Sequence, residues 1–544
     1  MKKWTALLLA GIMMLSCLAG CGGKETTTPS TSTPSTSTPS TSTPEEPKQG
    51  TSTTDMNKDK VEIKEDVKYK EKVVLAYGGK TTTIDPQVVS NIHHDTIFKL
   101  SHNSLICYDW DKKEMVPELA TEWSVAADGK TWTFKLRNDV EFHNGEKMTA
   151  DDVVFTFERA KETGVSGSNA YTQIESIKAV DDYTVEMTLT GANADWLYLL
   201  QYTYCSILNR EAVEKDPVDG AGIGTGGWKI SKWENGADTH FERYDNSWVW
   251  KVNPLTPTKQ LVLATMTEDS ARVVATQTGE VDFNISVPLV EIPVLEKDEK
   301  LKTATIDVDT IYFLGFNNQT GICSDVNMRK AISYAVDPQE LLIAYYEGYG
   351  NTCETFWGPN QYGIYTDYAD PLETNLDKAK EFLAKTNYNG ETLRFVTITS
   401  FADTAALMQA QLLKAGIKTE IVTVDSQGLN ATCKALEFDF FFYNKSCGPH
   451  GDQFRTVLTY GHNTNRAQFE SARVMELLDL AVVEQDDAKR KAMYQEIQQI
   501  AHDEMPYRPL FYGTNGYAWG KNVSGTIWCG DNKHDYTFIV CAEG

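Results

Sequence analysis

Three short motifs in the chain resemble catalytic or metal-binding patterns, and each departs from its pattern. GGKT at residues 78–81 is similar to the end of a phosphate-binding loop, but the first glycine of that motif falls on Val74. GVSGS at residues 164–168 lacks the closing glycine of a nucleophile elbow. His93 and His94 are adjacent, and on a strand they would face opposite ways, so no shared metal site is expected. We therefore expect a binding protein without cofactor or metal rather than an enzyme.

The start of the chain predicts export and lipidation. Two lysines precede an apolar run at residues 6–20, which is short for a membrane-spanning helix of about 20 apolar residues. LAGC at residues 18–21 is similar to the lipobox of bacterial lipoproteins, in which the cysteine receives a diacylglyceryl group. Residues 1–20 are thus expected to be a lipoprotein signal peptide and Cys21 the lipidated residue, with an ordinary signal peptide as the alternative. Two acyl chains would anchor the protein stably.

The segment after Cys21 has the composition of a tether. The pentapeptide STSTP occurs three times in tandem, and apolar residues are scarce as far as about residue 60. Such a segment buries too little surface to offset the entropy of ordering it. Residues 21–68 are therefore predicted to be the lipidated cysteine and a disordered Ser/Thr/Pro tether.

Composition argues against some partners, but it does not decide whether the cysteines form disulfides. The formal net charge of −25 argues against binding to nucleic acid or to an anionic membrane surface. The ten cysteines include no CxxC spacing, and eight remain beyond Cys17 and Cys21. An even number in an exported protein permits disulfides without showing them, so no pairing is predicted. The 544 residues favour two or three domains.

Periodicity predicts an α/β protein. Residues 130–142 and 181–189 alternate apolar and polar side chains, as half-buried strands do. Between them, Thr149 and Asp152 have the spacing of a helix cap, and we interpret Asp151 and Asp152 as a charged first turn rather than a catalytic pair.

The later half of the chain alternates helices and strands. Residues 325–348 predict two helices separated at Asp337-Pro338. Residues 392–399 predict a strand, residues 403–416 a helix that ends at a glycine, and residues 418–424 another strand. A βαβ unit of this kind places ligands near the carboxyl ends of its strands.

Four long segments are similar, in the same order, to the family 5 extracellular solute-binding proteins of ABC transporters, the peptide-, oligopeptide- and nickel-binding group. The similarity extends from Val73 to about Gly525. One departure is Gly227, which replaces a proline of the family pattern. The four segments are residues 105–160, 224–248, 312–337 and 466–512.

The resemblance implies a bilobed fold of the periplasmic-binding-protein type (type II, cluster C) with an extra inserted N-terminal subdomain. Lobe I would comprise residues 69–105, 222–308 and 512–544, the inserted subdomain residues 106–221, and lobe II residues 309–511. It also implies a monomer that captures a small-molecule ligand, expected to be a peptide, and delivers it to an ABC permease and its ATPase subunits. The protein would act at the extracellular face of the cell membrane, held by its lipid anchor.

The resemblance also selects candidate ligand-binding residues. In peptide-binding relatives, an aspartate that is often followed by proline, in a loop of the second lobe, pairs with the peptide amino group. The comparable stretch here, residues 438–454, has no Asp-Pro. A gapless alignment places His450 at that position, whereas an alignment with one gap places Asp452 there. His450 could accept a hydrogen bond or ligate a metal, and Asn444 is the first polar candidate beside the same loop.

Two aromatic residues complete the predicted site, and the ligand class stays open. Trp357 and Tyr204 fall where relatives line the cleft, although core packing would explain them as well. The missing Asp-Pro keeps an oligosaccharide or a nickel chelate as alternative ligands within the same fold. An anchored extracellular hydrolase and a receptor that passes a peptide signal to a sensor are the alternatives from other classes.

Overall fold

The computed structural model describes residues 63–89, 91–110, 112–163, 170–462, 464–528 and 534–543. The predicted signal peptide, the lipidated Cys21, the tether as far as residue 62, and Cys529 lie outside the described residues. By contacts the chain divides into residues 1–46 and residues 47–544, so every described residue belongs to the second unit. Among the described helices, none combines the length and the apolar composition that a membrane crossing requires.

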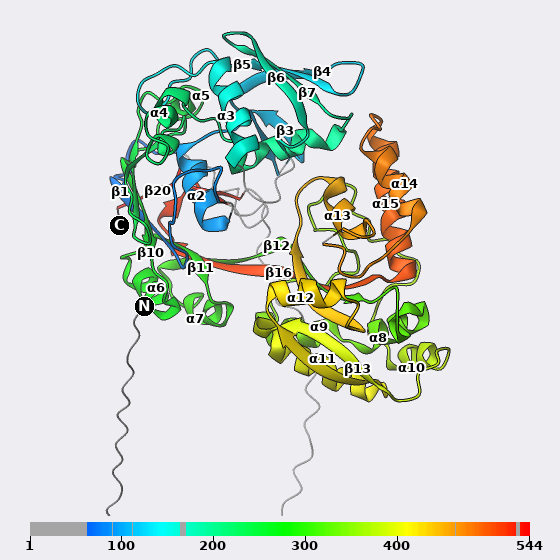
Figure 1. The fold of residues 1–544 in the computed structure, drawn as a ribbon. Helices are drawn as coiled ribbons and strands as arrows, with labels where there is room; N and C mark the ends of the chain where they lie inside the picture. Colours follow the sequence, from blue (N-terminus) through cyan, green and yellow to red (C-terminus); the bar gives the residue numbers. More distant parts are fainter. Residues whose placement is uncertain are drawn as a thin grey trace, which may run out of the picture. The chain divides into compact units, whose positions relative to one another are not determined.

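A ten-stranded mixed sheet forms the framework of this unit (Figure 1). One part of the sheet is the first lobe, in which β1 pairs in parallel with both β10 and β11. Another part is the second lobe, in which β13 pairs in parallel with both β14 and β15. The strand order is β14-β13-β15-β12-β16-β11-β1-β10-β9-β8.

Two long strands join the lobes. β12 (Leu301–Phe316) and β16 (Tyr507–Gly520) pair antiparallel, from Leu301 opposite Gly520 to Gly315 opposite Tyr507. In the first lobe β16 also pairs with β11, and in the second lobe β12 also pairs with β15. The register shifts between Val308 and Ile311, so a β-bulge lies where the strands pass from one lobe to the other.

A separate four-stranded antiparallel sheet, in the order β4-β5-β7-β6, lies within the predicted inserted subdomain. Both alternating segments are strands, β5 (Thr131–Leu136) and β7 (Thr184–Leu189), as predicted. The predicted helix start is confirmed, because α3 (Ala150–Thr163) is preceded by Thr149, whose backbone N–H donates to Asp152 Oδ2 at 2.9 Å. The domain boundaries themselves stay a prediction.

The predicted elements of the second lobe are present. α8 (Val326–Ala335) and α9 (Pro338–Tyr346) separate at Asp337, whose carboxylate accepts from two N–H groups at the start of α9. β13 (Thr392–Ile398), α11 (Ala402–Lys414) and β14 (Lys418–Val424) form the predicted parallel βαβ unit. Buried apolar side chains cover both faces of this part of the sheet.

One local prediction is wrong. His93 and His94 lie on a helix, α2 (Ile92–Ser101), not on a strand. Their rings make separate hydrogen bonds, with Thr81 Oγ1 for His93 and with the backbone N–H of Thr82 for His94. The apolar residues of this stretch are too few to show helical periodicity, so the Asn91 cap and the packing of the helix decide its conformation.

The remaining elements complete the described fold. In the first lobe and the inserted subdomain these are β1 (Lys72–Tyr77), β2 (Ile106–Asp109), β3 (Glu114–Pro117), β4 (Ala120–Val125), β6 (Ile174–Asp181), η1 (Ala194–Gln201), η2 (Thr203–Cys205), α4 (Arg210–Lys215), η3 (Gly220–Gly222), β8 (Trp228–Lys232), β9 (Thr239–Arg243), α5 (Val249–Val252), β10 (Gln260–Thr265), α6 (Asp269–Thr278), β11 (Phe283–Val287), η4 (Leu289–Glu291), α7 (Ile292–Leu295), β17 (Val523–Ser524), β18 (Ile527–Trp528), β19 (His534–Asp535) and β20 (Val540–Cys541). In the second lobe they are η5 (Ile322–Ser324), α10 (Leu376–Leu383), η6 (Thr399–Phe401), α12 (Ser426–Lys434), β15 (Phe440–Ser446), η7 (Gly451–Phe454), α13 (Arg455–Leu458), α14 (Ala472–Ala481) and α15 (Asp487–Glu504).

The two ends of the described chain meet at one edge of the first lobe. Tyr69 forms an isolated antiparallel bridge with Ala542. The backbone N–H of Lys70 donates to Cys541 O at 2.8 Å, and that of Glu543 donates to Lys68 O at 2.7 Å. The point where the tether would enter the folded body therefore lies beside the C-terminal segment.

Candidate functional site

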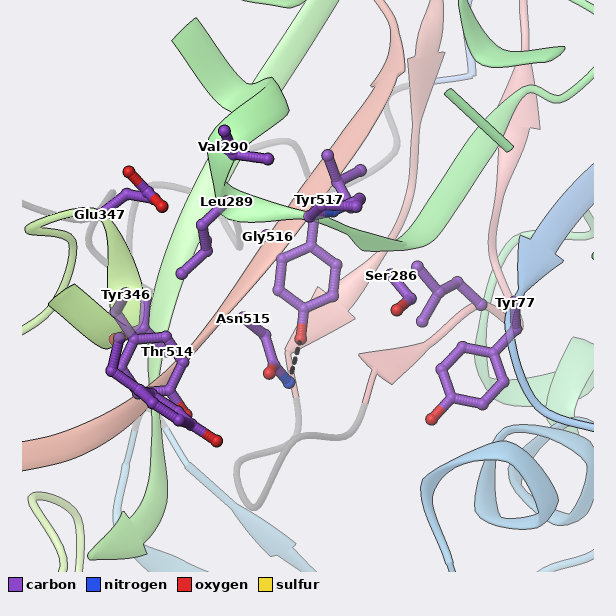
Figure 2. Close-up of a pocket in the computed structure, with 14 residues that line it drawn as sticks. Tyr77, Ser286, Leu289, Val290, Tyr346, Glu347, Thr514, Asn515, Gly516 and Tyr517 are labelled. Atoms are coloured by element: carbon purple, nitrogen blue, oxygen red, sulfur yellow. Dashed lines mark hydrogen bonds between the residues drawn. The ribbon is translucent and has the colours of Figure 1, made fainter. Parts of the chain in front are cut away.

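A cavity of about 400 Å³ lies between the lobes, beside the crossing strands (Figure 2). We call it the interlobe pocket. Its lining comes from Tyr77 of β1, residues 285–290 of β11 and η4, residues 514–517 of β16, and residues 345–347 at the end of α9. The first lobe and the second lobe both contribute side chains, which is the arrangement of a site that two lobes share.

Strand polarity explains why the pocket forms here. Tyr77 is the last residue of β1, and residues 285–290 lie at the carboxyl end of β11, which is parallel to β1. The carboxyl ends of parallel strands meet at the same edge of a sheet, where α/β proteins commonly bind ligands. The crossing strand β16 supplies the pocket with Asn515 and Tyr517, whose polar groups approach to 3.5 Å.

Tyrosines provide much of the polar lining. Tyr346 Oη donates to Tyr312 Oη at 2.9 Å, and Tyr345 packs edge-on against Tyr346 with ring centroids 4.8 Å apart. Burial raises the pKa of Tyr346 to about 12, and burial also raises the pKa of Tyr312 and Tyr345. These phenols are therefore neutral at physiological pH and serve as hydrogen-bonding groups.

Asn444 lies directly behind this tyrosine group. It is opposite Tyr312 in the β12–β15 ladder, so the two side chains lie on the same face of the sheet. Asn444 is thus next to Tyr312, whose hydroxyl accepts a hydrogen bond from Tyr346 of the pocket lining. It does not itself line the pocket.

Two carboxylates lie in or directly behind the pocket wall. Among the described residues that line it, Glu347 is the charged one, and it is exposed at the end of α9. Thr514, also in the lining, donates its hydroxyl to Asp307 Oδ1 at 2.9 Å, so a second carboxylate lies behind the wall. Burial raises the pKa of Asp307, while its hydrogen bonds with Asn351 and Thr514 oppose the rise.

A second contact between regions distant in sequence involves Asp195 on η1. The carboxylate is 2% exposed. Its Oδ2 accepts from Tyr494 Oη at 2.7 Å and from the backbone N–H of Asp452 at 3.1 Å, and Arg490 Nη1 lies 3.9 Å from Oδ1. Next to it, the backbone N–H of Ala194 donates to Val482 O at 2.7 Å. We call Asp195, Asp452, Arg490 and Tyr494 the Asp195 cluster.

Asp452 has an internal partner for its charge. Arg455 Nε donates to both carboxylate oxygens, at 2.9 and 3.0 Å, and Arg455 Nη1 donates to Asp479. Burial raises the pKa of Asp452 to about 7, with smaller contributions from Asp195 and Asp479 in the same direction, whereas Arg455 lowers it. The carboxylate that the sequence offers to a ligand ammonium is thus paired with a guanidinium of the same chain.

His450 lies in the same loop, just before η7. Its backbone carbonyl accepts from Gln361 Nε2 at 2.9 Å. The ring nitrogen Nδ1 is buried without a hydrogen-bond partner. Burial lowers the pKa of His450, so the imidazole is neutral at physiological pH.

The two predicted aromatic residues are both in cores. Trp357 is 0% exposed and packs on Phe454, with ring centroids 4.5 Å apart. Tyr204 is 9% exposed and stacks on Tyr202 at 5.2 Å. The structure therefore places Asp452, His450 and Trp357 around η7, Asn444 behind the interlobe pocket, and Tyr204 in the inserted subdomain.

Sequence reasoning missed most of the pocket and the centre of the Asp195 cluster. The apolar run at residues 73–76 was an unused signal for a buried strand, and Tyr77 follows it directly, at the kind of strand end where ligands gather. No sequence signal pointed to Asp195, since its hydrogen-bond partners Asp452 and Tyr494 lie more than 250 residues away along the chain. Within the described residues, no group of three His, Cys, Asp or Glu side chains could hold a metal ion. Five described cysteines are unpaired thiols: Cys205, Cys323, Cys353, Cys433 and Cys541.

Two α/β lobes joined by a pair of crossing strands, with a pocket that both lobes line, define a solute-binding protein of the bilobed type. The family model for bacterial extracellular solute-binding proteins, family 5 middle, matches residues 114–467. The chain therefore belongs to the family 5 solute-binding proteins of ABC transporters. This confirms the family and the fold class inferred from sequence, and it identifies the chain as a binding component rather than an enzyme.

Individual relatives support the same assignment over most of the chain. The probable ABC transporter periplasmic-binding protein SapA of Escherichia coli is 26% identical over 493 residues, covering 84% of this chain and 89% of the relative. The structure is similar to HbpA2 from Haemophilus parasuis, with a TM-score of 0.78 and 21% identity over 86% of this chain and 99% of that one. It is also similar to DppA from Helicobacter pylori in complex with the peptide STSA, with a TM-score of 0.70 and 25% identity over 88% of this chain and 99% of that one.

Proposed function

We propose that this chain captures peptides in the interlobe pocket as the substrate-binding component of an ABC importer. The observation that carries the proposal is the position of the pocket, lined by both lobes at the carboxyl ends of β1 and β11. Its volume of about 400 Å³ is within the range of small-molecule sites. The similarity to DppA, whose structure holds the peptide STSA, favours peptides over other solutes.

The proposal includes an anchor and a delivery step. Cys21 would carry the lipid, residues 21–68 would be the tether, and the folded body from about residue 69 would work at the extracellular face of the membrane. A tether raises the local concentration of the binding protein near its permease without a new contact between them. LAGC at residues 18–21 and the STSTP repeats support this part of the proposal.

The predicted site residues take distinct roles in the proposal. Asn444 would support Tyr312, its neighbour in the β12–β15 ladder, and the hydroxyl of Tyr312 accepts the hydrogen bond from Tyr346 at the pocket. Asp452 belongs to the Asp195 cluster, and His450 and Trp357 lie around the same loop, where they would shape the approach of the two lobes, whereas Tyr204 would stabilise the core of the inserted subdomain. The domain boundaries at residues 106, 222, 309 and 512 remain part of the same proposal.

Native mass spectrometry of residues 47–544 tests the proposal. Proteins that enclose a ligand between two lobes retain it when release requires the lobes to separate. A co-purifying mass series whose spacings equal amino-acid residues would support peptide capture. Hexose spacings or the mass of a metal chelate would contradict it in favour of the sugar or nickel alternative.

A matched variant connects the ligand to the pocket. Asn515→Ala removes an amide from the pocket wall, and it should lower the bound fraction if the ligand lies there. Asn389→Ala removes an exposed amide from a loop outside the pocket and should leave the bound fraction unchanged. Equal occupancy in both variants would place the ligand elsewhere.

A further inference from the structure

We propose that residues 56–62 dock in a largely apolar pocket on the first lobe, so that the proposed tether ends at about residue 55 rather than at residue 68. The inference concerns the attachment of the tether, and it is independent of the ligand that the interlobe pocket binds. It rests on the pocket itself, on the place where the described chain begins, and on two apolar side chains in an otherwise polar segment.

This second cavity has a volume of about 300 Å³, and we call it the tether pocket. Its described lining is uncharged and comes from both ends of the folded body, from the loop after α5, and from the segment that joins β17 to β18. The lining residues are Ile63, Asn253, Pro254, Thr256, Gly525, Thr526, Ile527 and Phe538. Thr256 and Thr258 both donate their hydroxyls to Ile539 O, at 3.4 and 3.0 Å. These bonds hold the loop after α5 on the C-terminal segment, so the pocket is a property of the folded body.

Exposed apolar residues extend from the rim of the tether pocket. Pro254 is exposed, and it lies between Val252 and Leu255, which are 54% and 45% exposed. Single exposed apolar residues are common on protein surfaces, whereas a group of them beside a cavity marks an interaction site. The tether pocket and these residues therefore form one apolar surface that a further segment of chain can cover.

The described chain begins at this pocket. Ile63 lines it and is half-buried. The backbone N–H of Lys64 donates to Tyr69 Oη at 3.1 Å, and that of Val67 donates to Lys64 O at 3.3 Å. Tyr69 in turn bridges to Ala542. These contacts hold the turn after Ile63 on the first lobe, so the preceding residues must leave from the rim of the tether pocket.

The sequence before Ile63 has the pattern of a segment with one apolar face. Val61 and Ile63 alternate with three charged residues, Lys60, Glu62 and Lys64. In an extended chain, side chains two positions apart point to the same side, so Val61 would face the pocket together with Ile63. The charged side chains would face water.

Met56 supplies a second apolar contact. Within residues 24–62, Met56 and Val61 are the aliphatic side chains other than proline. Met56 lies seven positions before Ile63, and an extended chain of that length spans about 23 Å, enough to reach the exposed apolar residues at the rim. A methionine side chain is unbranched and fits irregular apolar surfaces.

The covalent connection favours this segment over a separate partner. Residue 62 is bonded to Ile63, which already lines the pocket, so the segment is present at a high effective concentration. Docking would attach the tether to a fixed point on the first lobe. It would also shorten the free chain between the proposed lipid and the folded body.

Limited trypsin digestion of residues 22–544 tests the inference. Lys58 and Lys60 lie in the segment proposed to dock, and Lys48 lies before it. A protease cuts a segment only when the segment is locally detached, so docking slows cleavage in proportion to the time spent docked. We expect cleavage after Lys60 to be about tenfold slower than cleavage after Lys48, as measured by mass spectrometry of the fragments.

A variant of the pocket with a matched control separates docking from the sequence preference of trypsin. Pro254→Asp places a charge in the pocket wall and leaves the tether sequence unchanged, so it should raise the rate of cleavage after Lys60 by about tenfold. Pro371→Asp makes the same change in an exposed loop outside the pocket and should leave that rate unchanged. Val61→Ser removes the apolar side chain from the segment instead, and it should raise the rate of cleavage after Lys58.

The inference is overturned if wild type is cut equally fast after Lys48 and Lys60, or if neither Pro254→Asp nor Val61→Ser speeds cleavage within residues 56–62. It is also overturned if wild type sediments as a dimer and Pro254→Asp as a monomer, because a second copy of the chain would then cover the pocket. None of these results bears on peptide capture, since the interlobe pocket and the tether pocket share no described lining residue.

Discussion

The interlobe pocket and the Asp195 cluster are two places where distant parts of the chain meet. The polar groups of the cluster bond to one another, whereas those of the pocket line a cavity. In the Asp195 cluster, a buried carboxylate accepts hydrogen bonds from Tyr494 and Asp452 of the same chain. In the interlobe pocket, hydroxyls, an amide and a carboxylate line a cavity of about 400 Å³. Buried polar groups that are satisfied internally stabilise a contact, whereas groups facing a cavity can bind a ligand. Changes at the cluster should therefore affect stability, and changes at the pocket should affect binding.

The largest effect is expected from Asp195→Ala. It would leave the hydroxyl of Tyr494 and the backbone N–H of Asp452 without their acceptor, and Arg490 would keep Asp487 but lose its buried carboxylate partner. Removal of one partner from a buried charged network costs about 3–5 kcal/mol. Urea denaturation should show a loss of this size, and Glu175→Ala, which removes an exposed carboxylate from β6, should show almost none. If Asp195→Ala lowers the free energy of unfolding by less than 1 kcal/mol, the Asp195 cluster is not the stabilising contact that this comparison expects.

Gly451→Ala should have the next largest effect. An added Cβ at Gly451 would collide with the ring of Tyr494, which is 0% exposed and cannot move easily. Overpacking of this kind costs about 1–3 kcal/mol. Gly191 is the control, since a Cβ there would meet no atom within 4 Å. Equal free energies of unfolding for the two variants would show that the loop before Asp452 can shift away from α15.

The pH dependence of stability tests the electrostatics of the cluster. The pKa of Asp452 is about 7 in the folded protein, whereas an unfolded aspartate titrates near pH 4. Because the folded pKa is the higher one, this group contributes stability that is complete below about pH 4 and is lost as the pH rises through about 7. Asp452→Asn cannot titrate, so its free energy of unfolding should improve relative to wild type between pH 5 and pH 8.

The charges around Asp452 define how that result is interpreted. Arg455 pairs with it, and Asp195 and Asp479 are the neighbouring carboxylates that raise its pKa. If chemical denaturation at several pH values gives parallel profiles for wild type and Asp452→Asn, the Arg455 pair dominates and the carboxylate is charged throughout. The cluster would then resemble an ordinary ion pair.

The smallest effect on stability is expected from Asn515→Ala in the pocket. Its amide donates to the Tyr517 hydroxyl at 3.5 Å, which is the long limit for a hydrogen bond. Substitutions away from a packed core change the free energy of unfolding by about 0.5 kcal/mol or less. Thermal unfolding of the ligand-free variant should match wild type, while its ligand occupancy falls. A loss above 2 kcal/mol would mean that the pocket wall is as tightly integrated as the Asp195 cluster.

Much of the fold was predictable because its signals are local. The alternation in β5 and β7, the cap at Thr149 and the Asp337-Pro338 break each depend on residues a few positions apart. The long family motifs supplied the two-lobed arrangement that local signals could not. Helix α2 was mistaken for a strand, because its few apolar residues carry no clear period.

The site was less predictable, because it depends on contacts between residues far apart in the chain. The family resemblance drew attention to Asp452, but whether a carboxylate faces a ligand depends on neighbours such as Arg455, which follows it on the next turn. Tyr77 and Tyr346 meet at one pocket although 269 positions separate them, and no pattern along the chain expresses that proximity. The amino-acid composition likewise does not predict the bulge in β12 between Val308 and Ile311.

The bridge between Tyr69 and Ala542 has a consequence for how the chain could be rebuilt. Because the first and last described strands of backbone lie side by side, a short linker could join them, and new ends could be opened in an exposed loop such as the one at Gly390. Such a circular permutant would keep every strand pairing of the ten-stranded sheet. It would also move the attachment point of the proposed tether, so that the orientation in which the folded body would be held becomes an experimental variable.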